Sequence, residues 1–180
     1  MLNVVLVNPA RGDTYAQPPM GLALLAAVLE AADYPVAIVD ANALNLTPAE
    51  VAAQTAGADV IGLTAMTPSI GFALATAAHL KDALPEAKIV LGGAHATLLP
   101  EETMNSAPAL DVIVRGEGEI STPALLRALE QGTPLDEVPG ISFRKDDRIV
   151  HTASQPDVID VETLPYLAYH LLPRGVYRPH

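Results

Sequence analysis

Hydrophobic residues occur along this chain in short unbroken runs, which alternate with longer segments in which apolar positions recur every three or four residues. An unbroken run rich in β-branched residues is typical of a strand buried on both faces, whereas the longer spacing predicts a helix with one buried side. Five runs fit the strand pattern, at residues 2–8, 36–40, 59–65, 87–93 and 111–116.

Helical segments connect these predicted strands. They cover residues 19–33, 47–57, 69–84 and a stretch after the fifth strand that runs to Gly132. Thr47 and Glu50 form a capping-box pattern at the start of the second helix, and Gly57 is placed to end it. Alternation of buried strands and helices predicts a parallel sheet covered on both faces. We therefore expect a flavodoxin-like, doubly wound α/β domain with five parallel strands in the order 2-1-3-4-5.

The pattern changes in the last quarter of the chain. Residues 140–152 alternate in polarity around Asp146 and Asp147, which predicts a β-hairpin at an edge of the sheet. From Gln155 onward the sequence is irregular, bears Pro and Tyr, and lacks a periodicity that would give it a core of its own. We expect a domain at residues 1–136, a hairpin extension at 137–154 and a connector at 155–180.

Composition narrows the possible functions. The net charge of −11 disfavours nucleic-acid binding, which needs a basic surface. The absence of cysteine excludes thiolate metal sites, iron–sulfur clusters and cysteine nucleophiles within this sequence. Apolar runs are shorter than the roughly 18 residues of a membrane span, and the first residues lack the charged region of a signal peptide. A cytoplasmic protein is the default expectation.

Ligands of parallel α/β sheets bind beyond the carboxyl ends of the strands, so the loops there are the candidate site. The loop after the first strand, NPARGDTYAQPPMG, is longer than the usual ~2–6 residues, which suits either a surface excursion or a flap over a large ligand. It lacks G-x-G-x-x-G, so a dinucleotide is not expected. After the third strand, Thr64, Thr67 and Ser69 supply hydroxyls. Ser69 is placed to cap the next helix, which does not explain Thr64.

The loops after the fourth and fifth strands contain glycines. Gly92 and Gly93 permit either a plain turn or the close approach of a ligand, and Pro100 with two glutamates predicts a helix start. His95 has no acid, nucleophile or second ligand at a useful spacing, so a bystander role in the loop is favoured.

In the fifth loop, Glu119 falls near a helix N-terminus, where the dipole favours a carboxylate. Glu117 lies between Gly116 and Gly118, where that reason does not hold. It is placed to accept hydrogen bonds from a ligand or to hold Arg115.

Five segments together resemble a known family: NPARG…PPMGL, GLTAMTPS, VLGGAHATLLPEE, VIVRGEGE and LPYLAYHLLP. They are similar to the N-terminal half of cobalamin-dependent radical S-adenosylmethionine enzymes, which include class B methyltransferases and the anaerobic Mg-protoporphyrin IX monomethyl ester cyclase. Other cobalamin proteins carry D-x-H-x-x-G after the first strand, whose His ligates cobalt. This chain reads NPARG there, with neither Asp nor His, and the radical enzymes also lack D-x-H-x-x-G. The chain lacks their C-x-x-x-C-x-x-C cluster motif.

The resemblance implies that cobalamin binds base-off, without a histidine lower ligand, and that its flat nucleotide base enters a slot beside the sheet. S-adenosylmethionine and a [4Fe-4S] cluster would belong to a radical domain C-terminal to this chain. This chain would not be catalytic on its own. A stand-alone corrinoid carrier and a flavodoxin-like domain for another nucleotide such as FMN remain alternatives. The implied cofactor-binding residues are Asn8, Pro9, Pro19, Met20, Gly21, Thr64, Ala65, Met66, Thr67, Ser69, Gly92, Gly93, His95, Gly116 and Glu117.

Overall fold

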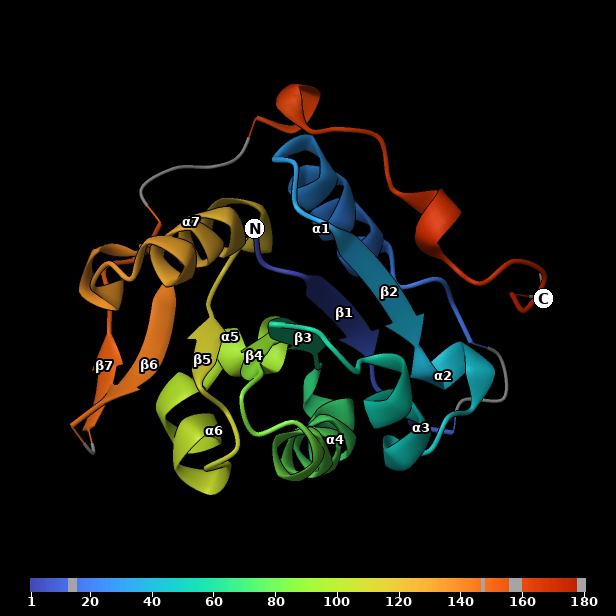
Figure 1. Ribbon diagram of the computed structural model, residues 1–180, viewed down its shortest axis with the longest axis horizontal. Coiled ribbons are helices and arrows are strands. Elements are labelled where there is room, and N and C mark those ends of the chain that lie inside the picture. Colours follow the sequence, from blue (N-terminus) through green and yellow to red (C-terminus); the bar gives the residue numbers. More distant parts are fainter. Residues whose placement is uncertain (13–15, 147, 156–159, 178–180) are drawn as a thin grey trace.

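A computed structural model describes all residues except 13–15, 147, 156–159 and 178–180. Its described strands form a single sheet in the order β2-β1-β3-β4-β5-β6-β7 (Figure 1). The first five strands pair in parallel, whereas β6 joins β5, and β7 joins β6, in antiparallel fashion. The strands are β1 (Val4–Asn8), β2 (Val36–Asp40), β3 (Val60–Thr64), β4 (Lys88–Gly92), β5 (Val112–Val114), β6 (Ile141–Lys145) and β7 (Arg148–His151). The predicted parallel order 2-1-3-4-5 and the edge hairpin are confirmed.

Helices cover both faces of the sheet and create three layers (Figure 1). Helices α1 (Met20–Ala31) and α7 (Gly118–Gln131) lie on one face. The other face carries α3 (Pro48–Gln54), α4 (Ile70–Ala83), α5 (Ala94–Leu98) and α6 (Pro100–Ser106), while the short α2 (Ala41–Leu44) follows β2 directly. None of the described helices is long and apolar enough to cross a membrane.

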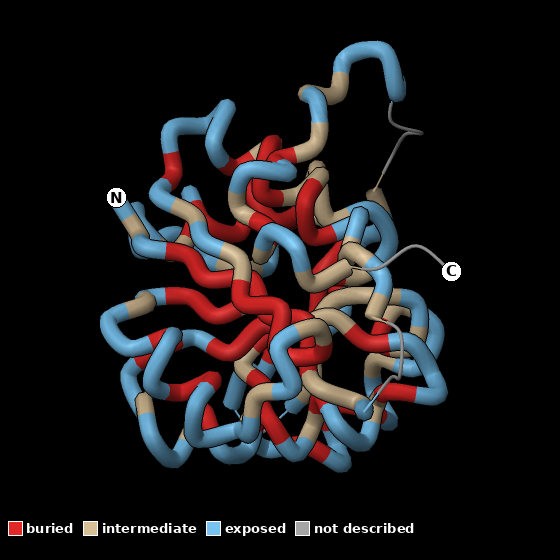
Figure 2. The backbone as a smooth tube through the Cα atoms, turned by 90° about the vertical axis from the view of Figure 1, so that its right-hand side faces the viewer, coloured by how far each residue is buried: buried red, intermediate tan, exposed pale blue. Residues whose placement is uncertain are grey.

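Strand residues divide alternately between two hydrophobic clusters, because successive side chains of a strand point to opposite faces. Val5 and Val7 belong to the cluster under α3, α4 and α6, whereas Val4 and Leu6 belong to the cluster under α1 and α7. Figure 2 shows the buried residues concentrated along the middle layer, with exposed residues on the outside of both helix layers. Burial on both faces explains why the strands read as unbroken apolar runs.

Helix boundaries follow the predicted signals in part. Thr47 and Glu50 form the expected capping box at the start of α3, and Pro100 opens α6. Helix α3 ends at Gln54, short of Gly57, and both the N–H and the hydroxyl of Thr55 donate to the carbonyl of Val51. Helices α2 and α5 were not predicted, since four or five residues are too few to show a helical period.

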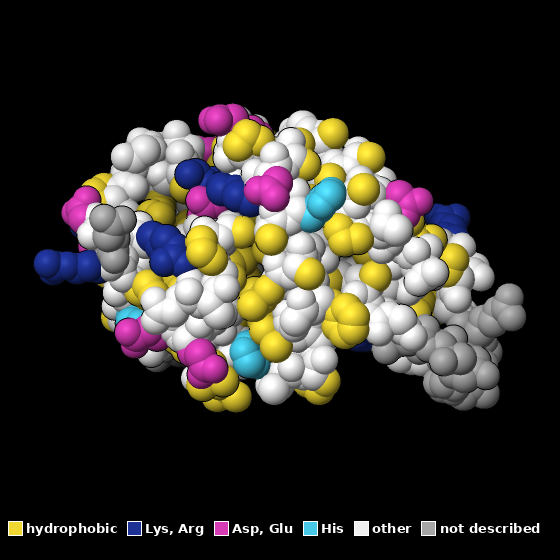
Figure 3. Space-filling model, turned by 90° about the horizontal axis from the view of Figure 1, so that it is seen from below, with side chains coloured by type: hydrophobic (Ala, Val, Ile, Leu, Met, Phe, Trp, Pro, Cys, Tyr) yellow, Lys and Arg dark blue, Asp and Glu magenta, His cyan; other side chains and the backbone are white. Residues whose placement is uncertain are grey.

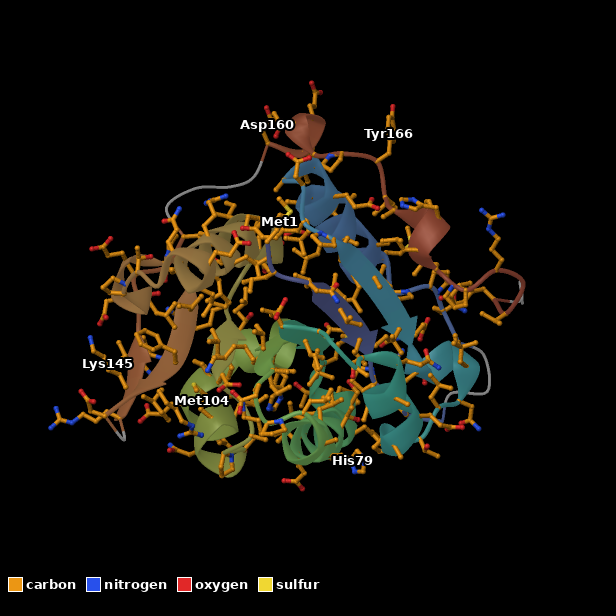
Figure 4. The ribbon with its side chains drawn as sticks, viewed as in Figure 1. Met1, His79, Met104, Lys145, Asp160 and Tyr166 are labelled. Atoms are coloured by element: carbon orange, nitrogen blue, oxygen red, sulfur yellow. The ribbon has the colours of Figure 1, made fainter. Side chains whose placement is uncertain are left out.

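The C-terminal segment packs against the domain over the part that the structure describes. It runs beside α1 toward the end of β2, with Ala168 and Leu172 buried (Figure 1). The Ala168 N–H donates to the Ala23 carbonyl of α1 at 3.0 Å. Tyr166 is 100% exposed and points away from the molecule (Figure 4). Among its described residues, the predicted connector is thus anchored to its own domain at Ala168 and Leu172.

Candidate functional site

Two glycines face the same side of the sheet on neighbouring central strands. Gly62 of β3 lies in register with Leu6 of β1, and Gly92 of β4 lies in register with Thr64 of β3. Residues two apart on a strand share a face, so Gly62 and Thr64 both face the α1–α7 side, as do Val90 and Gly92. Where the neighbouring positions carry leucine or valine, these two positions carry no side chain. The Leu6 side chain reaches over Gly62, where a Cβ would lie 2.9 Å from its Cδ2 atom, so the open part of this strip beneath α1 and α7 lies at Gly92.

A cavity of about 200 Å³ occupies this strip between the sheet and the two helices. Its walls are mainly apolar, with the hydroxyls of Thr64 and Thr122 and the carboxyl groups of Glu117 and Glu119 among the polar groups. A mostly apolar pocket with a few convergent polar groups is the usual form of a small-molecule site. The apolar side chains that line it include Val4, Leu6, Leu22, Leu25, Val60, Val90, Val114 and Leu125.

Gly92 and Gly93 are adjacent but serve different purposes. A Cβ atom at Gly92 would meet nothing closer than 4.0 Å, so this residue leaves open space at the cavity wall. A Cβ at Gly93 would lie 2.5 Å from the Ala65 carbonyl oxygen, and its φ of 98° falls in the region that favours glycine. Gly93 is therefore required by the close approach of the loops after β3 and β4, whatever ligand binds.

The loop after β5 is held in place by Gln155, the last described residue before the gap at 156–159. Its side-chain amide donates to the Glu117 carbonyl and to the Ser121 hydroxyl, and accepts from the Glu117 N–H at 3.3 Å. Gly116, with φ of 74°, passes close to this side chain. The start of the C-terminal segment thus positions one wall of the cavity.

Arg115 has a role that sequence analysis did not assign. Its guanidinium donates to the backbone carbonyls of Ile141 and Thr152, which anchors the loop to the β6–β7 hairpin. Among the described residues it forms no ion pair with Glu117, so holding Arg115 is not the role of that carboxylate in this structure.

Glu119 is the more buried of the two glutamates in this loop. Its Oε2 atom is inaccessible to solvent and has no hydrogen-bond partner in the described part of the chain. Burial raises the pKa of the Glu119 carboxyl, a hydrogen bond from its own backbone N–H opposes that shift, and the nearby charge of Glu117 adds to it. Sequence analysis selected Glu117, which is exposed, and explained Glu119 by the helix dipole. The sequence does carry a signal for Glu119: it lies three residues before Thr122 and six before Leu125, so it falls on the stripe of α7 that is buried.

The loops after β3 and β4 meet at the carboxyl end of the sheet. His95 Nδ1 lies 3.2 Å from the Thr67 hydroxyl, which links the two loops. Ser69 is buried and its hydroxyl both accepts from the Met66 N–H and donates to the Met66 carbonyl, so it closes a turn. Met66 itself is 62% exposed at this end of the sheet. Ala65, the residue before Met66, is buried.

The loop after β1 contributes a buried polar group. The Asn8 amide donates to Asp40 at 2.8 Å, and Asp40 also accepts from the Tyr177 hydroxyl at 2.7 Å and from the Ala43 N–H at the start of α2. Pro9 is buried beside it. The predicted flap lies partly outside the described residues, at 13–15.

Pro19 and Met20 mark the other end of that loop, at the start of α1. Met20 is half-exposed, and its sulfur lies 3.6 Å from the Tyr169 hydroxyl of the C-terminal segment. The N-terminal end of α1 therefore lies between the cavity and the C-terminal segment.

The structure brings together six of the sequence-predicted site residues on the cavity wall: Gly21, Thr64, Gly92, Gly93, Gly116 and Glu117. The other nine lie in the loops around the carboxyl end of the sheet or at the start of α1. Sequence analysis missed Gly62, Glu119 and Thr122. A glycine in the middle of a buried strand is itself a signal, because it weakens the strand unless something approaches closely.

The fold and the cavity define a class: a doubly wound α/β domain with an apolar slot between its sheet and two helices. A family model described as the B12 binding domain matches residues 5–126. The chain belongs to this family, whose cofactor is cobalamin.

Known proteins support the same assignment. An uncharacterized methyltransferase of Pyrococcus horikoshii is 33% identical over 163 residues, which cover 89% of this chain and 35% of that protein. The anaerobic magnesium-protoporphyrin IX monomethyl ester cyclase of Rubrivivax gelatinosus is 35% identical over 82% of this chain and 28% of its own length. The chain thus spans about a third of the length of these curated relatives.

A solved structure confirms the fold. The cobalamin-dependent S-adenosylmethionine radical enzyme OxsB, with aqua-cobalamin and S-adenosylmethionine bound, superposes with a TM-score of 0.82 at 20% identity. The match covers 93% of this chain and 24% of that protein.

Proposed function

We propose that this chain holds cobalamin base-off, with the nucleotide base of the cofactor in the cavity beneath α1 and α7. The observation that carries the proposal is the open cavity wall at Gly92, on the face of the sheet that these helices cover. Nothing in the packing of the strands requires glycine at Gly92, where a Cβ would meet open space. A planar ring would fill the strip with apolar contacts on both of its faces.

The size of the cavity supports a part of the cofactor as its occupant. At about 200 Å³ it is smaller than the roughly 300–1,000 Å³ of pockets that enclose whole drug-sized ligands. A bicyclic base suits this volume, whereas a corrin ring does not. The ring would lie outside, over the loops that follow β1, β3 and β4, where the exposed Met66 and the side chains of Thr67 and His95 are gathered.

Each of these groups has a role in the proposal. The hydroxyl of Thr64, at the cavity wall, would donate to the nucleotide tail, and Thr67 and Ser69 would lie along its path. Asn8, Pro9, Pro19, Met20 and Ala65 would support the corrin ring, and Gly21, Gly93, Gly116 and Glu117 would border the slot. Bound cobalamin supplies a cobalt that can carry a methyl group or take part in radical chemistry.

A base-off state without a protein histidine is the finer part of the proposal. The loop after β1 begins Asn8-Pro9 where a ligating histidine would stand in other cobalamin domains. His79, on α4, lies in the opposite helix layer and points away from the sheet (Figure 4). His95 Nδ1 is next to Thr67. Electron paramagnetic resonance of the cob(II)alamin complex should therefore show no superhyperfine splitting from an axial nitrogen.

Isotope labelling makes this test decisive. A nitrogen triplet that persists when the protein is labelled with ¹⁵N would show that the cofactor's own base still binds cobalt. A triplet that becomes a doublet on labelling would show a protein nitrogen ligand. Either result contradicts the proposal. Binding itself is read separately, from the absorption spectrum of the chain after gel filtration with aqua-cobalamin or with FMN, so that a flavin site would be recognised.

The larger enzyme is proposed from the relatives. The chain covers 35% of the Pyrococcus methyltransferase, 28% of the cyclase and 24% of OxsB. We infer that residues 1–136 form the cofactor domain, 137–154 extend its sheet, and 155–180 lead to a radical domain that holds S-adenosylmethionine and a [4Fe-4S] cluster. The activity would be a methyl transfer or a cyclisation. The net charge of −11 argues against nucleic acid as a partner.

A further inference from the structure

Glu119 stands out in the cavity because it is a carboxyl group with an unused buried oxygen. Buried polar atoms are nearly always hydrogen-bonded, and one without a partner needs an explanation. Leu22, Leu25 and Leu125 in the cavity wall are apolar. In the described part of the chain, the polar groups of the wall (Thr64, Thr122 and Glu117) make no hydrogen bond to Glu119 Oε2 either. The residue lies one helical turn before Thr122, on the side of α7 that faces the sheet.

A neutral carboxyl group can donate a hydrogen bond as well as accept one. Burial raises the pKa of the Glu119 carboxyl, so the neutral, donating form is easier to reach than for an exposed glutamate. A benzimidazole base that has left cobalt has one ring nitrogen whose lone pair is free, and a purine base has this nitrogen and others of the same kind. Buried without a partner, that nitrogen would weaken binding for the same reason that the Glu119 oxygen is unfavourable now. One hydrogen bond would satisfy both groups, wherever the shared proton resides.

We propose that Glu119 is a specificity-determining residue that hydrogen-bonds the free ring nitrogen of the cofactor's lower base. The site would then select corrinoids with an azole or purine base over those with a phenolic base, which has no such nitrogen. This inference rests on the proposed entry of the base into the cavity. It adds a chemical criterion for which corrinoids the domain accepts.

The test uses two corrinoids and three variants of the full chain. The probes are cobalamin and p-cresolylcobamide, whose phenolic base offers no ring nitrogen. The variants are Glu119→Ala, Glu119→Gln, whose amide still donates a hydrogen bond, and Glu102→Ala, a control that removes an exposed carboxylate on α6. Dissociation constants are measured by fluorescence quenching or calorimetry, and a thermal melt confirms that each variant is folded.

We expect Glu119→Ala to weaken cobalamin binding by about 10- to 100-fold, as for the loss of a buried hydrogen bond, and to change p-cresolylcobamide binding by less than about threefold. Glu119→Gln should stay within about threefold of the unaltered chain for both probes, as should Glu102→Ala.

Two results would overturn the inference. Equal losses for both corrinoids in a folded Glu119→Ala chain would mean that Glu119 only shapes the cavity. Unchanged cobalamin affinity in that variant would mean that the nitrogen does not meet Glu119, while cobalamin binding itself would stand. If the unaltered chain bound neither corrinoid, the proposed function would fail rather than this inference.

Discussion

The two faces of the sheet are built from alternate residues of the same strands, yet one is filled with side chains and the other is open at its centre. On the α4 face, Ile61, Leu63, Ile89 and Leu91 are all buried against helix residues. On the α1–α7 face the corresponding positions include Gly62 and Gly92, and a cavity of about 200 Å³ lies above them. Helices cover both faces, so the difference comes from the strand residues themselves.

The comparison shows how a single sheet separates stability from binding. The filled face buries large aliphatic side chains, which is the dominant favourable term in folding. The open face gives up part of that burial at two positions and keeps an apolar slot. Figure 3 shows the outer surface of the α3, α4 and α6 layer, where hydrophobic side chains (yellow) lie scattered among white backbone and other side chains and most of the visible Lys and Arg lie toward the hairpin.

The largest effect is expected from a cavity made on the filled face. Leu91 is 0% exposed beneath the α4 layer, and Leu91→Ala should lower the free energy of unfolding by about 2–5 kcal/mol. Cobalamin affinity of the folded fraction should change by less than about threefold, because the side chain points away from the slot. Denaturant titration and a binding assay at low temperature would measure both. A loss of binding larger than the loss of folded protein would contradict this separation of the two faces.

The neighbouring residue should behave in the opposite way. Gly92→Val projects a branched side chain into the open slot from a position where a Cβ would meet nothing closer than 4.0 Å. Cobalamin affinity should fall at least ~100-fold, which corresponds to about 2.7 kcal/mol, with an unchanged or raised melting temperature. Gly92→Ala, with a smaller side chain, should give an intermediate loss. Full affinity in a folded Gly92→Val chain would place the nucleotide base elsewhere.

The smallest effect concerns the carboxyl group in the open face. Burial raises the pKa of Glu119 in the folded chain above its unfolded value, so the unfolded state ionises first as the pH rises. This group therefore costs stability once the pH exceeds the unfolded pKa, and the cost is complete above the folded pKa. In acid, Glu119→Gln should be as stable as the unaltered chain. At neutral pH its free energy of unfolding should be higher by less than about 1 kcal/mol, given the partial exposure of the residue, and it should melt at a slightly higher temperature.

Paired melts across this pH range, with Glu102→Gln as the matched exposed substitution, would measure the difference. If Glu119→Gln were less stable than the unaltered chain at neutral pH, the carboxylate would have a stabilising partner and its oxygen would not be available to a ligand.

Much of the fold could be predicted from the sequence, because its signals are local. Unbroken apolar runs predicted all five parallel strands, and the capping box formed by Thr47 and Glu50 predicted the start of α3. The hairpin after Gly140 followed from alternation of polarity. The predicted site was less complete. It named the loops at the carboxyl ends of the strands, and six of its residues line the cavity.

The sequence by itself determined the order of elements, the parallel sheet and the family resemblance, since periodicity and motifs are properties of neighbouring residues. Only the tertiary structure decided which glycine opens the slot. Gly92 faces empty space, whereas Gly93 sits against the backbone of Ala65, a residue far from it in the chain. Only the structure showed that Glu119, and not Glu117, has a buried oxygen without a partner. Burial and partnership depend on what other segments bring to the same place, which no local pattern records.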